Sequence, residues 1–125
     1  MKLLLPLLQL DRITDNGNIY DSDFIDGIVG NKIPVIDNKN NIVGYGILKH
    51  DTVKNWLTVN VWFDDSKCGT EAWNMLTNNY KYCLSPKSQV DIDDGKNGTI
   101  IKFIVLEASI IEKHLSAQDF DTYYN

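Results

Sequence analysis

The chain has 125 residues, of which 43% are hydrophobic and 23% charged, and its formal net charge is −5 at pH 7. This length and composition predict one globular domain, residues 1–125, with a modest core, and they exclude intrinsic disorder. The surplus of carboxylates excludes nucleic acid as the main partner, because phosphate binding needs clustered Lys and Arg.

The cysteine, histidine and glycine patterns indicate neither a metal site nor a cofactor. Cys68 and Cys83 form no Cys-x-x-Cys pair, and the two histidines lie far from them in the sequence, so neither a zinc site nor a disulfide-stapled scaffold is expected. Gly44 and Gly46 lack the third glycine and the following helix of a dinucleotide-binding fingerprint. We therefore expect no metal ion and no cofactor.

The N-terminal run is apolar but short. Residues 1–10 read MKLLLPLLQL, fewer than the roughly 20 residues that a membrane-spanning helix needs. Asp11 and Arg12 follow directly, and the run has no small-residue cleavage site of the kind that ends a signal peptide. We expect a buried first strand, with Pro6 at an edge or a bulge, and no membrane partner.

Turn residues and apolar spacing divide the rest of the chain into short elements. In the first half, the sequence predicts a turn at 15–18, a short helix within 19–30, a short or edge strand at 33–36, a polar loop at 37–41 and strands at 42–48 and 55–63. In the second half, it predicts a helix at 69–80, an extended segment at 81–90 broken by Pro86, a hairpin turn at 93–98 and a long strand at 99–111. Residues 120–125 are expected to form a short helix or a flexible tail. These elements predict an α+β fold, an antiparallel or mixed β-sheet or barrel with two or three short helices.

The strand at 55–63 shows the clearest alternation in the chain. One face is aliphatic and belongs to the core, whereas the other carries Trp56 and Trp62. That second face has more apolar area than a solvated face normally carries, so we expect a helix or another chain to cover it. Trp56 and Trp62 are therefore candidate interface residues.

Two polar residues stand out in apolar surroundings. Glu107 interrupts the most apolar run of the chain, where a carboxylate is either at a strand end, paired, or part of a site. Ser85 lies near the end of an extended segment, where it either satisfies a backbone group or acts as a nucleophile. A nucleophile would need a base, and the chain offers only His50 and His114.

A series of short segments carries a family resemblance: NGNIY at 16–20, VIDN at 35–38, VG at 43–44, WLTV at 56–59, CLS at 83–85 and LEASII at 106–111. Their order resembles that of the prohead (capsid maturation) proteases of tailed bacteriophages, whose fold is shared with herpesvirus assemblin. The likeness covers most of the chain, from about Leu3 to Leu115.

The resemblance assigns three positions of the chain to the catalytic site of the family, and one of them no longer carries the catalytic residue type. Ser85 falls where the family has its nucleophilic serine, and Glu107 falls at its acidic position. Asn38 stands where the family places its catalytic histidine, and an amide cannot accept the serine proton. The resemblance therefore implies a prohead-protease-like fold with a degenerate site at Asn38, Ser85 and Glu107 and no catalysis.

The function implied is that of a structural virion protein, an auxiliary or decoration protein of a tailed-phage head. Its partners would be the major capsid protein or other virion proteins, or a second copy of itself, and it would reside in the virion after assembly in the host cytoplasm. Two alternatives stay open. Ser85 served by His50 or His114, with Glu107 as the orienting acid, would make an active maturation protease; without the family relationship, the chain would be a small cytoplasmic binding domain.

Overall fold

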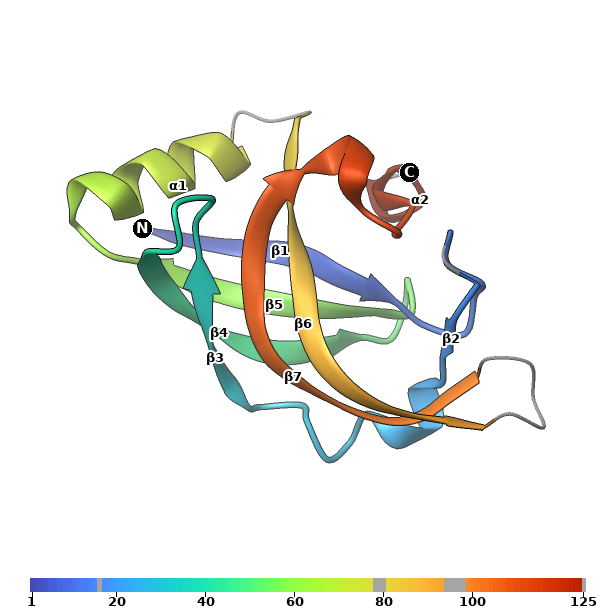
Figure 1. Ribbon diagram of the computed structural model, residues 1–125. Coiled ribbons are helices and arrows are strands. Elements are labelled where there is room, and N and C mark those ends of the chain that lie inside the picture. The colour runs from blue at the N-terminus through green and yellow to red at the C-terminus, as the bar shows by residue number, and fades with distance from the viewer. Residues whose placement is uncertain (16, 78–80, 94–98, 125) are drawn as a thin grey trace.

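The computed structural model describes residues 1–15, 17–77, 81–93 and 99–124. They form a mixed α+β structure in which seven strands share one curled sheet and two short α-helices pack against it (Figure 1). The predicted α+β class with a mixed sheet is thus confirmed. The elements are β1 (Lys2–Gln9), β2 (Ile19–Tyr20), the 3₁₀ turn η1 (Ser22–Phe24), β3 (Lys32–Ile36), β4 (Ile42–Asp51), β5 (Trp56–Phe63), α1 (Lys67–Thr77), β6 (Tyr82–Asp93), β7 (Thr99–Glu112), the 3₁₀ turn η3 (Lys113–Leu115) and α2 (Phe120–Tyr124).

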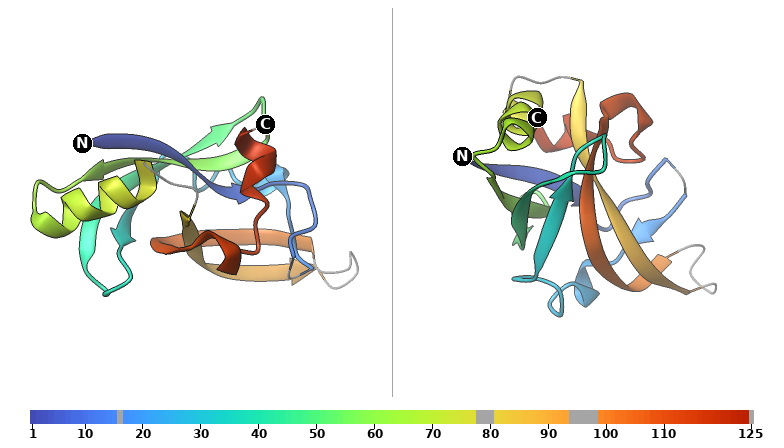
Figure 2. Two further views of the ribbon diagram at one scale, coloured as in Figure 1. Left: turned by 90° about the horizontal axis from the view of Figure 1, so that it is seen from above. Right: turned by 60° about the vertical axis from the view of Figure 1, so that its left-hand side comes forward.

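The sheet curls on itself into a half-barrel. Its strand order is β1-β5-β4-β3-β7-β2, and β6 pairs with β7. β7 runs parallel to β3 and β2 and antiparallel to β6, which makes the sheet mixed. Figure 2 (left) shows β1 and β5 along one side of the molecule and β6 and β7 along the other. Each strand therefore has an inward face towards the enclosed core and an outward face.

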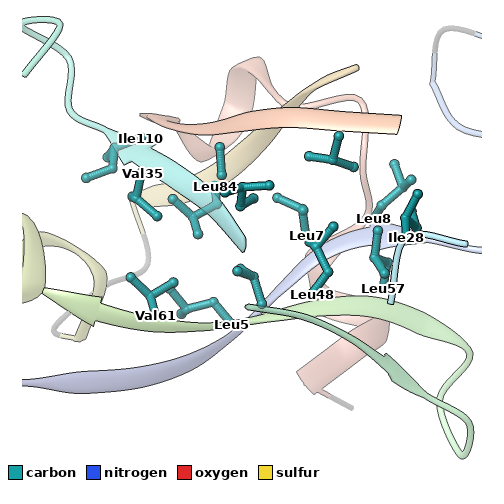
Figure 3. Close-up of a cluster of buried hydrophobic side chains, with 14 of the residues drawn as sticks. Leu5, Leu7, Leu8, Ile28, Val35, Leu48, Leu57, Val61, Leu84 and Ile110 are labelled. Carbon is teal, nitrogen blue, oxygen red and sulfur yellow. The ribbon is translucent and has the colours of Figure 1, made fainter. Parts of the chain in front are cut away.

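Aliphatic side chains from both sides of the half-barrel fill the core (Figure 3). Fully buried members include Leu7 of β1, Leu57 of β5 and Val35 of β3. Helix α1 adds Ala72 and Leu76 to the same cluster. Burial of this kind stabilises the fold by about 25 cal/mol per Å² of apolar surface removed from water.

Two bulges in β7 decide which of its residues face outward. The register with β6 shifts between Lys87 and Ser88 and again between Asp91 and Ile92. Phe103 and Val105 are buried on one side of the first shift, and Ala108 and Ile110 on the other. Because a bulge inserts one extra residue, it exchanges the inward and outward positions of the strand.

Prolines mark the places where strand pairing is interrupted. The register of β1 with β5 shifts between Pro6 and Leu8, as predicted for a bulge. Pro86 does not break β6, because β6 is paired with β7 alone and a proline at a free edge forfeits no ladder bond. The strand predicted at 33–36 as short or at an edge is short, with the 5 residues of β3, and it lies between β4 and β7 rather than at an edge. Pro34 is tolerated there because β7 pairs only with Val35 and Ile36.

The helix predicted within residues 19–30 is not an α-helix. β2 and the single 3₁₀ turn η1 replace it, and the side chain of Asp21 accepts a hydrogen bond from the backbone N–H of Asp23. Gly30 has a φ of +92°, which ends any helical path. Ile25 and Ile28 are nevertheless buried, so the apolar spacing identified the correct core residues.

Within the C-terminal segment, Phe120–Tyr124 form the short helix α2. Phe120 of α2 is 3% exposed and packs on Trp56 and Cys83 in a small second cluster. The predicted turn at 15–18 and helix at 69–80 extend beyond the described residues at Asn16 and at residues 78–80, and most of the predicted hairpin turn at 93–98 lies outside them. No helix in the described ranges is long and apolar enough to cross a membrane.

Candidate functional site

Ser85 and Glu107 lie on the same outward face of neighbouring strands. Ser85 pairs in register with Ser109, and Glu107 pairs with Lys87, two residues further along each strand. Leu84, just before Ser85, and Ala108, just after Glu107, face the other way and belong to the core. The bulge before Ala108 places Glu107 outward, so the carboxylate does not enter the core.

Glu107 is engaged by a cation. Its Oε1 lies 3.7 Å from Nζ of Lys87, and the two side chains are 26% and 68% exposed. A half-exposed pair of this kind contributes little to stability, because solvent screens it. The structural alternative for a carboxylate in this apolar run, a paired acid, is therefore the arrangement found.

Asn38 lies in the exposed turn between β3 and β4. The turn is organised by the neighbouring Asp37, whose carboxylate accepts hydrogen bonds from the backbone N–H groups of Lys39 and Asn41 at 2.9 and 2.8 Å. Partial burial would raise the pKa of Asp37, but these bonds outweigh it and hold the pKa below its ordinary value. β3 enters this turn beside β7, with Ile36 level with Ser109.

The three positions that carry the resemblance thus belong to three adjacent strands or their ends, β3, β7 and β6. Ile36, Ser109 and Ser85 form one row across the outward face. In the described part of the chain, no hydrogen bond joins Ser85 to Asn38, Glu107 or a histidine. Without a base to remove its proton, a serine hydroxyl is a weak nucleophile.

Both histidines are engaged elsewhere. His50 Nε2 lies 2.9 Å from Oδ1 of Asn55, whose amide nitrogen donates to Asp11 Oδ2 at 2.6 Å. His114 Nε2 lies 3.3 Å from Oε2 of Glu112 at the surface. Neither imidazole is bonded to Ser85 within the described residues.

The polar cluster around Asp11 was not predicted. Asp11 also accepts bonds from the N–H and hydroxyl of Ser22, so it ties the end of β1 to η1. Burial would raise the pKa of Asp11, but the bonds from Ser22 and Asn55 and the nearby His50 lower it. Asp11 and Asn55 adopt the left-handed backbone conformation, with φ values of 59° and 57°. Asp and Asn adopt this conformation more often than most residues, and their identity is the sequence signal for these two positions.

Of the two tryptophans on β5, only Trp62 is available to a partner. Trp56 is 1% exposed and packs against Phe120 and Tyr123, with ring centroids 5.5 Å apart in both cases. The candidate interface role of Trp56 is therefore corrected: α2 of the same chain covers it. Trp62, on the same face six residues on, is 46% exposed.

Trp62 belongs to a larger surface that we call the basic aromatic face, made of Lys2, Leu4, Lys32, Tyr45 and Trp62. Trp62 pairs in register with Lys2 on one side and with Tyr45 on the other. Nζ of Lys2 lies 5.5 Å from the Trp62 ring centroid, and Nζ of Lys32 lies 4.6 Å from that of Tyr45. The sequence signal for Tyr45, an aromatic residue between Gly44 and Gly46 in a strand, was overlooked.

The two glycines beside Tyr45 have a packing role. A Cβ at Gly44 would lie 2.3 Å from the backbone oxygen of Trp62, and one at Gly46 would lie 2.3 Å from Cγ2 of Val59. Both positions therefore require glycine, which lets β4 lie close against β5. The close approach holds Tyr45 and Trp62 side by side on the outward face.

The hollows in the described surface include an open one of about 650 Å³ lined by Lys113, His114 and Asp119 among others. The most enclosed one, between Leu5, Leu84 and Phe120 among others, has a volume of about 30 Å³, enough for about one water molecule. No group of three or more His, Cys, Asp or Glu side chains in the described ranges is placed to hold a metal ion. No known protein family, curated protein or solved structure matches this chain.

Proposed function

We propose that the protein is a structural component of a tailed-phage head, an auxiliary or decoration protein built on a prohead-protease-like fold that has lost its catalytic base. The observation that carries the proposal is the environment of Ser85. Ser85 and Glu107 share an outward face, but Glu107 is paired with Lys87 and neither histidine bonds to the serine.

The surface chemistry supports a docking role over a catalytic one. Trp62 and Tyr45 are 46% and 42% exposed and lie side by side in register. Exposed aromatic side chains are favoured anchors of protein interfaces, because they bury a large area at a low cost in side-chain entropy. In this proposal the partners are the major capsid protein or other virion proteins.

Quantitative mass spectrometry of purified mature particles of the virus that encodes this chain tests the proposal. A structural protein should be present at full length and at a copy number comparable with that of the capsid subunits. A maturation protease cleaves itself and leaves the head. Absence from mature particles, or self-cleaved fragments in immature heads alone, would favour the protease that uses Ser85. Absence from particles at every stage would favour a cytoplasmic binding domain.

A further inference from the structure

The basic aromatic face is charged in the opposite sense to the chain as a whole. The chain carries 17 Asp and Glu against 12 Lys and Arg, yet the outward positions of β1, β3, β5 and of β4 through Lys49 contain no carboxylate. Lys2, Lys32 and Lys49 are the charged residues there. This segregation favours an acidic occupant for the face, because charge complementarity selects the partner and steers its approach.

The two lysines that flank the aromatic rings make no ion pair within the described residues. Their ammonium groups lie over Trp62 and Tyr45. A cation held over an exposed aromatic ring is attracted to it only weakly, and it stays free to pair with a carboxylate from outside. Leu4, 55% exposed, extends the apolar part of the surface on β1.

The chain itself carries a surface of matching chemistry, which we call the Phe24 turn: Asp23, Phe24, Asp26 and Val29. Phe24 is 49% exposed and Val29 41% exposed, and the exposed Asp23 and Asp26 lie on either side of Phe24 in the sequence. Neither carboxylate has an ion-pair partner among the residues described. An aromatic ring between two free carboxylates complements two aromatic rings flanked by two free lysines.

Lys2 and Trp62 lie at the opposite end of β1 from Phe24, so Phe24 cannot reach Trp62 within one molecule, although Lys32 follows Val29 of the turn by only three residues. Lys2 begins β1 beside Trp62. The Phe24 turn instead follows Ser22, which is bonded to Asp11 just beyond the end of β1. Eight residues of strand separate the two ends, a length of about 26 Å at about 3.3 Å per residue. In Figure 2 (left), no helix of the described residues lies above β1 near the N-terminus.

We infer that the basic aromatic face binds the Phe24 turn of a second copy of this chain. Lys2 and Lys32 pair with Asp23 and Asp26, and Phe24 packs against Trp62 and Tyr45. The contact joins two different surfaces, so each copy keeps one free surface of each kind, and association continues into a ring or a filament. The inference concerns the isolated chain and does not depend on the proposed capsid role.

Sedimentation velocity of the purified chain tests the inference, from about 1 μM to about 1 mM, the range in which weak specific contacts form. We expect the mass to rise above that of the 14.2 kDa monomer with concentration, and the association to weaken as salt screens the ion pairs. Lys2→Glu with Lys32→Glu, and separately Asp23→Lys with Asp26→Lys, place like charges against each other. Each double variant should raise the apparent Kd at least about 100-fold.

Mixing the two double variants provides the decisive measurement. Each variant alone carries one sign of charge on both surfaces, whereas the mixture again presents opposite charges at every contact and should associate. Lys67→Glu with Lys102→Glu, exposed lysines on α1 and β7, is the control for the Lys2→Glu and Lys32→Glu variant: it makes the same change in net charge and should associate like the unaltered chain. Circular dichroism confirms that each variant is folded.

Three results would overturn the inference. They are a monomer at every concentration, association that both double variants leave unchanged, and a mixture that stays monomeric. A fluorescent single-stranded oligonucleotide that binds the unaltered chain but not the Lys2→Glu and Lys32→Glu variant would replace the second copy with nucleic acid, since stacked aromatic rings and lysines also bind single strands.

Discussion

Asn60 lies at the centre of the outward side of β5, paired in register with Leu4 and Ile47 on the neighbouring strands. It is 8% exposed, and its Oδ1 is buried without a hydrogen-bond partner among the described residues. A buried polar atom left unpaired costs about 1–3 kcal/mol. The residue therefore weakens the strand that positions Trp62.

Replacing this amide should stabilise the protein. We expect Asn60→Val to raise the free energy of unfolding by about 1 kcal/mol, because it removes the unpaired oxygen and supplies a better strand former. Thr58→Val is the matched control on the same face: the Thr58 hydroxyl donates to the Lys49 carbonyl at 3.2 Å, and its loss should give no gain. Urea unfolding measures both; equal effects would contradict the argument.

Cys83 should be the unreactive thiol of the chain. Burial raises its pKa from 9.0 to about 11, against the opposing effects of the Ser116 hydrogen bond and the Lys113 charge. At pH 8 only about one molecule in a thousand then carries a thiolate, the reactive form. A maleimide should label only the half-buried Cys68 in the folded protein and both cysteines in denaturant. Rapid native labelling of two thiols would contradict this environment.

The same shift predicts how stability changes at high pH. The folded state holds the Cys83 proton more tightly than the unfolded state, so this contribution is complete below pH 9.0 and is lost as the pH rises to about 11. The free energy of unfolding should fall by up to about 1.4 kcal/mol per pH unit within that window. Cys83→Ala should remove this part of the pH dependence, measured by urea unfolding at several pH values.

At the scale of elements, α2 is the piece that closes the second cluster. The Phe120 ring is 3% exposed beside Trp56. Phe120→Ala should lower the free energy of unfolding by roughly 3 kcal/mol, through lost burial and the cavity left behind. Leu115→Ala, at a position 67% exposed just before α2, should change it by less than about 0.5 kcal/mol. Similarly small effects for both variants would mean that α2 is not packed against Trp56.

The contrast between the two tryptophans shows what the sequence can predict about an element. Alternation in the strand at 55–63 placed Trp56 and Trp62 on one face, which the register confirms. It also predicted that something covers that face. Alternation could not tell which tryptophan is covered, because Phe120 reaches Trp56 from more than 50 residues away. Local periodicity contains no information about such a contact.

The position of Glu107 shows the same limit within one strand. A regular alternation through 99–112 would continue the buried series of Phe103 and Val105 to residue 107 and bury the carboxylate. The bulge between the pairs formed by Lys87 and Ser88 reverses the faces. Bulges depend on how two strands pair, so the outward position of Glu107 and its place beside Ser85 required the structure.

At the scale of the whole molecule, the half-barrel brings β3, β7 and β6 side by side. Ser85 is in β6, Glu107 is in β7, and Asn38 follows the end of β3. The order of segments along the sequence suggested that these positions belong together, but strand adjacency follows from long-range pairing alone. Side by side on one sheet, they are not bonded to one another among the described residues: both histidines are bonded elsewhere, and the acid is paired with Lys87.

This separation makes a prediction that distinguishes a structural protein from an enzyme. Ser85 and Ser109 face each other in register on the same outward surface, and both are half-buried. Ser85→Ala and Ser109→Ala therefore make the same change in volume and polarity at neighbouring points. For a structural protein, both variants should give heads of normal yield with uncleaved scaffold levels unchanged, measured by gel densitometry and electron microscopy of particles. A protease would respond to Ser85→Ala alone, with immature heads and uncut precursor, because only the nucleophile is irreplaceable in acyl transfer. A loss of precursor cleavage with Ser85→Ala but not with Ser109→Ala would show that Ser85 is a catalytic nucleophile.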